Sequence, residues 1–165
     1  MIPAPIPTDE TQRLDALRQL LVLDTPPEER FDRITRFAAR EFDMPVALVS
    51  LIDANRQWFK ARVGLEACET TRDISFCGHA IEGSAVMVVE DAREDPRFAD
   101  NPLVTGDPFI RFYAGAPLVL PGGLSVGTLC VIDIEPRSFS RIDQSILSAL
   151  RDVVVEELMR QAAEP

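Results

Sequence analysis

A cysteine and the only histidine of the chain lie two residues apart, at Cys77 and His79. Ser75 or Asp73 just before them is a good helix N-cap, so we expect Cys77 in the first turn of a helix. A helix N-terminus lowers the pKa of a thiol and makes it more reactive. Cys77 is therefore the candidate reactive cysteine, although a buried free cysteine more often packs as a small apolar residue.

A shared metal site at this pair is not expected. Side chains two residues apart on a helix point in nearly opposite directions, so Cys77 and His79 cannot hold one ion together. Cys68 and Cys130 are the other cysteines, and no CxxC spacing supports a zinc site. We predict no metal ligands, and we expect His79 to be structural or to line a pocket.

The segment that contains this pair is followed by more candidate residues. The stretch 86–90 is typical of a strand and ends at Asp91, a long irregular segment spans 92–107, and a predicted strand begins beside Arg111 and Tyr113. This order places a large excursion on one face of a sheet, where binding residues concentrate. The residues predicted to bind a small ligand, with none catalytic, are Phe76, Cys77, His79, Asp91, Arg111 and Tyr113.

Patterns of apolar residues predict the elements that hold this excursion. Amphipathic helices are expected at 11–23 and 26–42, and a long C-terminal helix begins after Ser140. Thr25, Pro26 and Glu28 have the spacing of a capping box at the start of the second helix. Apolar runs of strand length are expected to form the sheet at 46–52, 57–63, 86–90, 112–120 and 124–132.

The fold class that these elements predict is α+β. Strands joined by short turns pair antiparallel, which gives a central antiparallel sheet of five to six strands. Helices from both ends of the chain are expected to cover one face, and the excursion of 65–110 covers the other and forms a pocket. Surplus apolar surface on the last helix, at Val154, Val155 and Leu158, predicts a homodimer.

Charge limits the partners and the ligand. Seventeen basic residues stand against 27 acidic ones, a net charge of −10, so we expect neither nucleic-acid nor membrane-surface binding. Residues 66–107 contain ten acidic and three basic residues, a local balance of −7. A polyphosphate would be repelled unless Arg72, Arg97 and Arg111 converged on it, so a neutral or cationic ligand is predicted.

Location follows from features that are absent. The N-terminus has no pattern of a secretory signal, and no apolar run approaches the ~20 residues that a membrane helix requires. Three cysteines, an odd number, do not suggest a disulfide framework. The expected location is the reducing cytoplasm.

Three stretches carry a family resemblance: Arg56-Gln57-Trp58-Phe59-Lys60-Ala61, Thr71 to Ile81, and Gly127-Thr128-Leu129-Cys130-Val131-Ile132-Asp133. Together they resemble the GAF family of bacterial sensory domains, which has a GAF/PAS-like sheet with ligands between the sheet and the excursion. The resemblance covers roughly 14–158; the prolines of the N-terminus predict a flexible arm at 1–10, and the chain length predicts a single domain at 11–162. The resemblance also implies dimerisation through terminal helices and signalling to a histidine kinase or diguanylate cyclase output partner.

One enzyme branch of this family, the free methionine-(R)-sulfoxide reductases, is the main alternative. Cys68 and Cys77 have nearly the spacing of two cysteines in that branch, but the stretch 95–101, which matches its catalytic loop, has no cysteine. Asp100 in that stretch cannot replace the attacking thiolate. Some GAF domains hold haem or bilin, but Gly78 separates the Cys-His pair that carries bilin, and the cofactor is left unidentified.

The sequence therefore predicts a cytoplasmic, non-catalytic signalling module that binds an unidentified small molecule and dimerises. The two alternatives are a thiol-dependent reductase that uses Cys77 and Cys68, and a dimerisation-only module whose pocket is filled.

Overall fold

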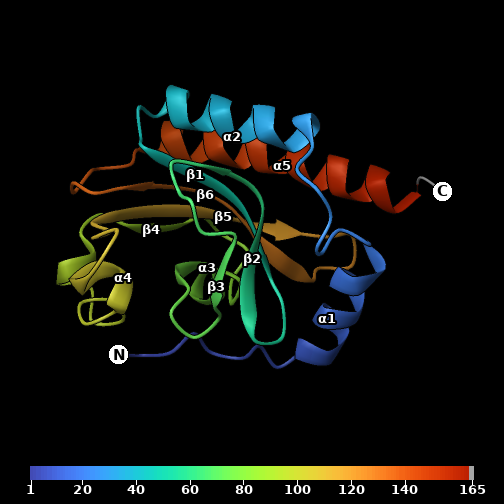
Figure 1. Cartoon of the computed structure of the whole chain (residues 1–165), viewed down its shortest axis with the longest axis horizontal. Helices are drawn as coiled ribbons and strands as arrows, with labels where there is room; N and C mark the ends of the chain where they lie inside the picture. The colour runs from blue at the N-terminus through green and yellow to red at the C-terminus, as the bar shows by residue number, and fades with distance from the viewer. Residues whose placement is uncertain (164–165) are drawn as a thin grey trace.

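The computed structural model describes residues 1–163 and has a six-stranded antiparallel sheet at its centre, with strand order β3-β2-β1-β6-β5-β4. Helices cover both faces of the sheet (Figure 1). The elements, in chain order, are α1 (Glu10–Gln19), α2 (Glu29–Glu41), β1 (Val46–Ile52), β2 (Arg56–Val63), β3 (Glu69–Thr71), α3 (Phe76–Ala80), β4 (Met87–Val89), the 3₁₀ helix η1 (Ala92–Glu94), α4 (Pro102–Thr105), β5 (Phe112–Val119), β6 (Ser125–Asp133) and α5 (Arg141–Ala163). The predicted fold class is confirmed.

Alternation along the strands divides the core between the two faces of the sheet. On β1, Ala47, Val49 and Leu51 join the core on the side of α2 and α5, whereas Val46, Leu48 and Ile52 join a second core under α3. On β2, Trp58 faces the helices and Phe59 faces α3, as its alternation predicts. The sheet is thus buried on both faces, which explains the near-continuous apolar runs of its central strands.

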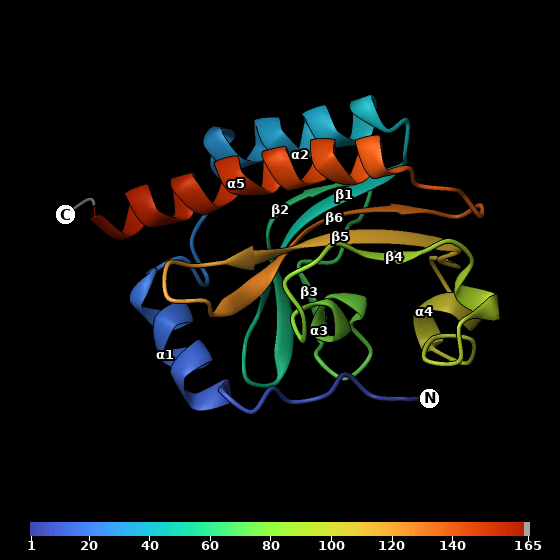
Figure 2. The ribbon, with the colours of Figure 1, turned by 180° about the vertical axis from the view of Figure 1, so that it is seen from behind.

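Helices α2 and α5 lie side by side over one face, as the two opposite views show (Figures 1 and 2). The predicted cap of α5 is present: the Asp143 amide donates to Ser140 Oγ, and the Ser140 amide donates to Asp143 Oδ2. Val154 and Leu158 are fully buried in this layer of the monomer. The sequence prediction that these two residues carry surplus surface for a dimer is therefore wrong, because α2 covers the side of α5 that the sheet leaves open.

Helix α1 does not join that layer. It lies beyond the end of the sheet, at the level of the excursion, and it ends at Gln19 rather than at residue 23 (Figure 2). The chain turns sharply after it, because Leu21 and Asp24 both take positive φ values. Leu17 and Leu20 are nevertheless buried in the core on the side of α2 and α5.

The predicted capping box at the start of α2 does not form. The helix begins at Glu29, and its N-cap Glu28 makes no side-chain capping bond. The reason is Lys60, whose side chain is fully buried and needs partners. Its Nζ donates to Thr25 Oγ1 and to the Pro26 carbonyl, both at 2.7 Å, and pairs with the Glu28 carboxylate at 2.6 Å, and residues 25–28 stay outside the helix.

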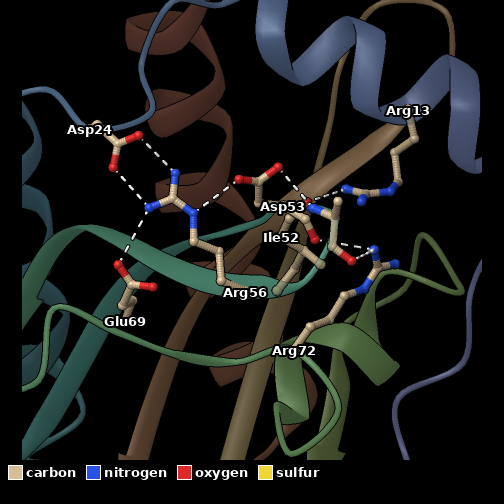
Figure 3. A network of polar contacts seen from close by, with 8 residues as sticks. Arg13, Asp24, Ile52, Asp53, Arg56, Glu69 and Arg72 are labelled. Atoms are coloured by element: carbon tan, nitrogen blue, oxygen red, sulfur yellow. Dashed lines mark hydrogen bonds and ion pairs between the residues drawn. The ribbon is translucent and has the colours of Figure 1, made fainter.

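The turn between β1 and β2 is held by three arginines from different elements (Figure 3). Arg13 of α1 donates to the Ile52 carbonyl at 2.7 Å, and Arg72 donates to the Asp53 carbonyl at 3.2 Å. Arg56 pairs with Asp24 at 2.8 Å and with Asp53 at 3.0 Å. These contacts attach α1 and the segment before α3 to the same end of the sheet.

The N-terminal residues before α1 lie along the excursion, beneath α3 (Figures 1 and 2). Ala4 is buried, and its amide donates to the Asp73 carbonyl at 3.0 Å. The Ile2 carbonyl lies 3.3 Å from His79 Nε2. Flexibility of residues 1–10 and the domain limits at 11–162 stay predictions. Within residues 1–163, no helix has the length and apolar character that a membrane span requires.

Candidate functional site

A cavity of about 370 Å³ lies between the sheet and the excursion. Its sheet wall comes from β1, β2, β3, β5 and β6, and its cover comes from α3, from the loop between β2 and β3, and from α4 with the loop after it. The residues that line it are Val46, Leu48, Gln57, Phe59, Gly64, Leu65, Glu66, Ala67, Thr70, Phe76, Cys77, Leu103, Asp107, Pro108, Ile110, Tyr113 and Ile132. The wall is mainly apolar, and its size falls within the range of ligand pockets.

Local sequence explains how the cover is built. α3 has the cap predicted at Ser75, whose Oγ accepts the Gly78 amide at 3.1 Å and donates to the Arg72 carbonyl at 2.6 Å. α4 was not predicted, although Asn101 followed by Pro102 is a strong start signal. The Asn101 side chain accepts the Leu103 amide and donates to the Ile74 carbonyl, so it fastens α4 to the start of α3.

Gln57 supplies the buried polar group on the wall. Its Oε1 accepts a hydrogen bond from Ser50 Oγ at 2.8 Å, and its Nε2 donates to Thr70 Oγ1 at 3.0 Å. Neither Gln57 nor Thr70 was among the predicted site residues. The signal for Gln57 was its position on the same face of β2 as Phe59, where a polar residue is unusual. Thr70 lies on β3, a short polar edge strand that has no apolar alternation to mark it.

Three of the six predicted site residues line the cavity: Phe76, Cys77 and Tyr113. The ring of Phe76 stacks on Phe98, with ring centroids 4.0 Å apart. Tyr113 is fully buried, and its side chain runs over Gly115, where an added Cβ would lie 2.2 Å from the tyrosine hydroxyl. The absence of a side chain at residue 115 therefore allows the hydroxyl of Tyr113 to reach Cys77.

The other three lie outside the cavity wall. His79 packs edge-on against Phe98, and its pKa is lowered because burial disfavours the charged ring. Asp91 caps η1 and pairs with Arg93 at 2.9 Å. Arg111 donates to the Val104 carbonyl at 3.0 Å and so holds α4.

Cys77 has the most unusual environment of the lining residues. Its Sγ lies 3.0 Å from Thr128 Oγ1, 3.1 Å from the Tyr113 hydroxyl and 3.9 Å from Cys130 Sγ. Burial raises the pKa of the Cys77 thiol, but hydrogen bonds from Cys130, Thr128 and Tyr113 outweigh it and lower the pKa to about 7. The predicted helix effect is small by comparison, because α3 has only five residues.

The charged groups at the cavity are acidic. Glu66 and Asp107 are both exposed and lie at its edge. Among the described residues that line the cavity, none is basic. Two of the arginines that a polyphosphate would need are used elsewhere, since Arg72 pairs with Glu10 and Arg97 with Asp95.

Cys68, the second thiol of the predicted reductase alternative, does not accompany Cys77. It is exposed in the loop before β3, where its Sγ lies 3.0 Å from Arg62 Nη1. The thiol beside Cys77 is Cys130 instead. Cys77 and Cys130 are separated by more than fifty residues of sequence, so only the pairing of α3 against β6 brings them together.

Comparisons with known proteins agree with this architecture. Residues 26–158 match the model of the GAF domain. A cyclic di-GMP phosphodiesterase of Pseudomonas aeruginosa is 50% identical over 137 residues, which are 83% of this chain and 23% of that protein. The chain therefore spans less than a quarter of the length of that relative.

Similar solved structures share the fold at low sequence identity. The GAF domain of an Acinetobacter phosphoenolpyruvate-protein phosphotransferase has a TM-score of 0.66 and 20% identity, covering 92% of this chain and 96% of that one. A free methionine-R-sulfoxide reductase from Neisseria meningitidis, in complex with its substrate, has a TM-score of 0.65 and 18% identity, covering 90% and 89%. The match to the family model over most of the chain settles the classification: this chain belongs to the GAF domain family.

Proposed function

We propose that this chain is a non-catalytic sensory module that binds a small, largely apolar molecule, neutral or cationic, between the sheet and the excursion. The observation that carries the proposal is the cavity of about 370 Å³, which has an apolar wall and one buried amide, Gln57, to orient a ligand. Phe76, Cys77 and Tyr113 are the proposed contacts from the sequence-derived set.

The ligand class follows from charge and burial. An anionic ligand would meet Glu66 and Asp107 at the edge of the cavity with no basic lining residue among those described to offset them. An apolar body gains free energy from the wall, at about 25 cal/mol per Å² of apolar surface removed from water. A nucleotide or dinucleotide is therefore disfavoured, and cyclic di-GMP, named for the Pseudomonas relative, is not the proposed ligand.

A screen of neutral and cationic metabolites by thermal shift tests this proposal. A ligand that binds only the folded state raises the melting temperature by mass action. Leu103→Trp places an indole at the partly exposed edge of the cavity and should reduce the affinity of any hit at least about ten-fold, or about 1.4 kcal/mol. Ile134→Trp, at an exposed position after β6, is the matched control and should bind normally. A hit unaffected by Leu103→Trp would bind elsewhere and would refute the site.

Dimerisation is the second part of the proposal, with a revised surface. Phe37 on α2 and Val153 and Met159 on α5 are exposed apolar residues on the two helices that lie side by side. We propose that a second copy covers this surface, because exposed apolar patches mark interfaces. Cytoplasmic location and an output partner such as a kinase, cyclase or phosphodiesterase belong to the same proposal; the Pseudomonas relative, named a phosphodiesterase, supports such an association.

Light scattering coupled to size exclusion should give twice the monomer mass at tens of micromolar. Val153→Asp should weaken the dimer at least about ten-fold, because it buries an unpaired charge at the interface. Ile134→Asp adds the same charge at an exposed position away from these helices and should leave the mass unchanged. A wild-type monomer at that concentration would contradict the dimer.

A specific observation favours non-catalysis over the reductase alternative. The stretch 95–101, which would carry the attacking cysteine, contains Phe98 instead, and its carboxylates are paired, Asp95 with Arg97 and Asp100 with the N-terminal amine of Met1. A carboxylate in an ion pair supplies no nucleophile comparable to a thiolate.

A further inference from the structure

Two buried thiols meet beneath the cavity. Cys77 of α3 and Cys130 of β6 are 2% and 0% exposed, and their sulfur atoms are 3.9 Å apart. Only Cys77 belongs to the cavity wall, so a small molecule in the cavity reaches Cys77 before Cys130. The third thiol, Cys68, is exposed and has Arg62 as its neighbour.

The surroundings of Cys77 suit a thiolate that attacks a molecule in the cavity. Hydroxyl groups of Thr128 and Tyr113 lie at 3.0 and 3.1 Å from its sulfur, and hydrogen bonds of this kind favour the charged form. Burial raises the pKa of Tyr113 well above its usual range, so its hydroxyl keeps its proton and remains a donor. Burial likewise raises the pKa of Cys130, which therefore stays a thiol. The two sulfurs thus differ in both access and protonation.

We propose that Cys77 is an oxidation site for small organic hydroperoxides that enter the cavity, and that Cys130 is the thiol that closes a Cys77–Cys130 disulfide. The class of oxidant follows from the wall, because Phe59, Leu65 and Ile110 favour an alkyl group over a fully hydrated molecule. In this reaction the cavity serves only as an entry path, and no signalling ligand is required.

The chemistry balances in two steps. The Cys77 thiolate attacks the terminal oxygen of ROOH; an S–O bond forms, the O–O bond breaks, and the alkoxide leaves as ROH after taking a proton from water. The sulfur of Cys130 then attacks the resulting sulfenic acid; an S–S bond forms, the S–O bond breaks, and the thiol proton leaves with the hydroxide as water. Two thiols are oxidised by two electrons, and one hydroperoxide is reduced to an alcohol.

The second step requires a modest movement. An S–S bond is about 2 Å long, so the sulfurs must approach by roughly 2 Å. As the Cys77 sulfur approaches Cys130, it would give up its contacts with Thr128 and Tyr113. The disulfide would join the cover of the cavity to a central strand of the sheet.

Thiol counting on the full chain tests the proposal. The reduced protein is treated with tert-butyl hydroperoxide, quenched, unfolded and alkylated, and its intact mass is measured. Wild type should lose two of its three alkylatable thiols together, and peptide mapping should find Cys77 joined to Cys130. The Cys68→Ser variant keeps both buried cysteines and should retain no alkylatable thiol after oxidation.

Two further variants identify the order of the steps. Cys130→Ser should stop at the sulfenic acid, which dimedone traps on Cys77, and Cys77→Ser should keep Cys130 alkylatable. Because wild type and Cys68→Ser leave the core unchanged, the main result does not depend on whether the buried variants fold. Three alkylatable thiols after excess hydroperoxide, a disulfide that contains Cys68, or sulfinic acid at Cys77 of the wild type would each overturn the proposal.

Discussion

Replacing Gly64 with alanine is expected to destabilise the fold by about 2–4 kcal/mol. Gly64 follows β2 with φ of +76°, a conformation that side chains rarely adopt. An added Cβ would also lie 1.9 Å from the Pro45 carbonyl oxygen, just before β1. Backbone cannot move aside as a flexible side chain would, so strain and steric overlap add at this position.

Urea unfolding of wild type and Gly64→Ala measures this loss directly. Gly83→Ala is the matched control, because its added Cβ meets nothing within 4 Å and its φ is not positive. That variant should change the free energy of unfolding by less than about 0.5 kcal/mol. Equal stability of the two variants would show that the β2 end does not approach Pro45 as described.

Replacing Glu10 with glutamine is also expected to have a large effect. It should lower the free energy of unfolding by about 2–3 kcal/mol near neutral pH. The Glu10 carboxylate pairs with both Arg13 and Arg72, whose side chains are 1% and 4% exposed. The variant leaves two buried guanidinium groups without their counter-ion. Because Arg13 and Arg72 also donate to carbonyls at the turn between β1 and β2, the variant should destabilise that turn as well.

The effect of Glu10→Gln on stability should depend on pH in a characteristic way. Burial raises the pKa of Glu10, but hydrogen bonds from Arg13 and Arg72 outweigh it and lower the pKa from 4.5 to about 2. A carboxyl group whose pKa is lowered by folding stabilises the fold fully above pH 4.5 and loses that contribution as pH falls toward 2. The difference in free energy of unfolding between wild type and Glu10→Gln should therefore shrink over that pH range.

Urea unfolding at several pH values between 7 and 3 measures the gap. Asp9→Asn removes an exposed carboxylate one residue away, which makes no capping bond in α1, and should track wild type. A gap that stays constant down to pH 3 would show that Glu10 acts by packing rather than by its charge.

Regular elements were predictable because their signals are local. The apolar runs at 46–52 and 124–132 and the cap at Ser140 depend on neighbouring residues and appear as expected. The start of α2 was not predictable, because Lys60, more than thirty residues away, occupies the Thr25 hydroxyl. A capping signal is decisive only when no distant group competes for it.

The same distinction between local and distant determinants decides which residues of the candidate site were predictable. Phe76, Cys77 and Tyr113 follow from the order of elements, because that order places them under the excursion. The role of Gln57 depends on how β2 pairs with β1 and β3, and the sulfur pair of Cys77 with Cys130 depends on the packing of α3 against β6, more than fifty residues later in the sequence. His79 and Arg111 are close in sequence to residues that line the cavity. Their side chains do not line it, however, and instead hold its cover in place.

The single tryptophan and the single histidine of the chain lie on opposite sides of the sheet, Trp58 in the core beneath α2 and α5 and His79 against the N-terminal residues. Each layer thus has its own intrinsic spectroscopic reporter without labelling. The indole emission follows the environment of the paired helices, whereas the imidazole proton resonances follow the docking of the first residues beneath α3. A local change on one side of the sheet that alters both signals is therefore transmitted across it.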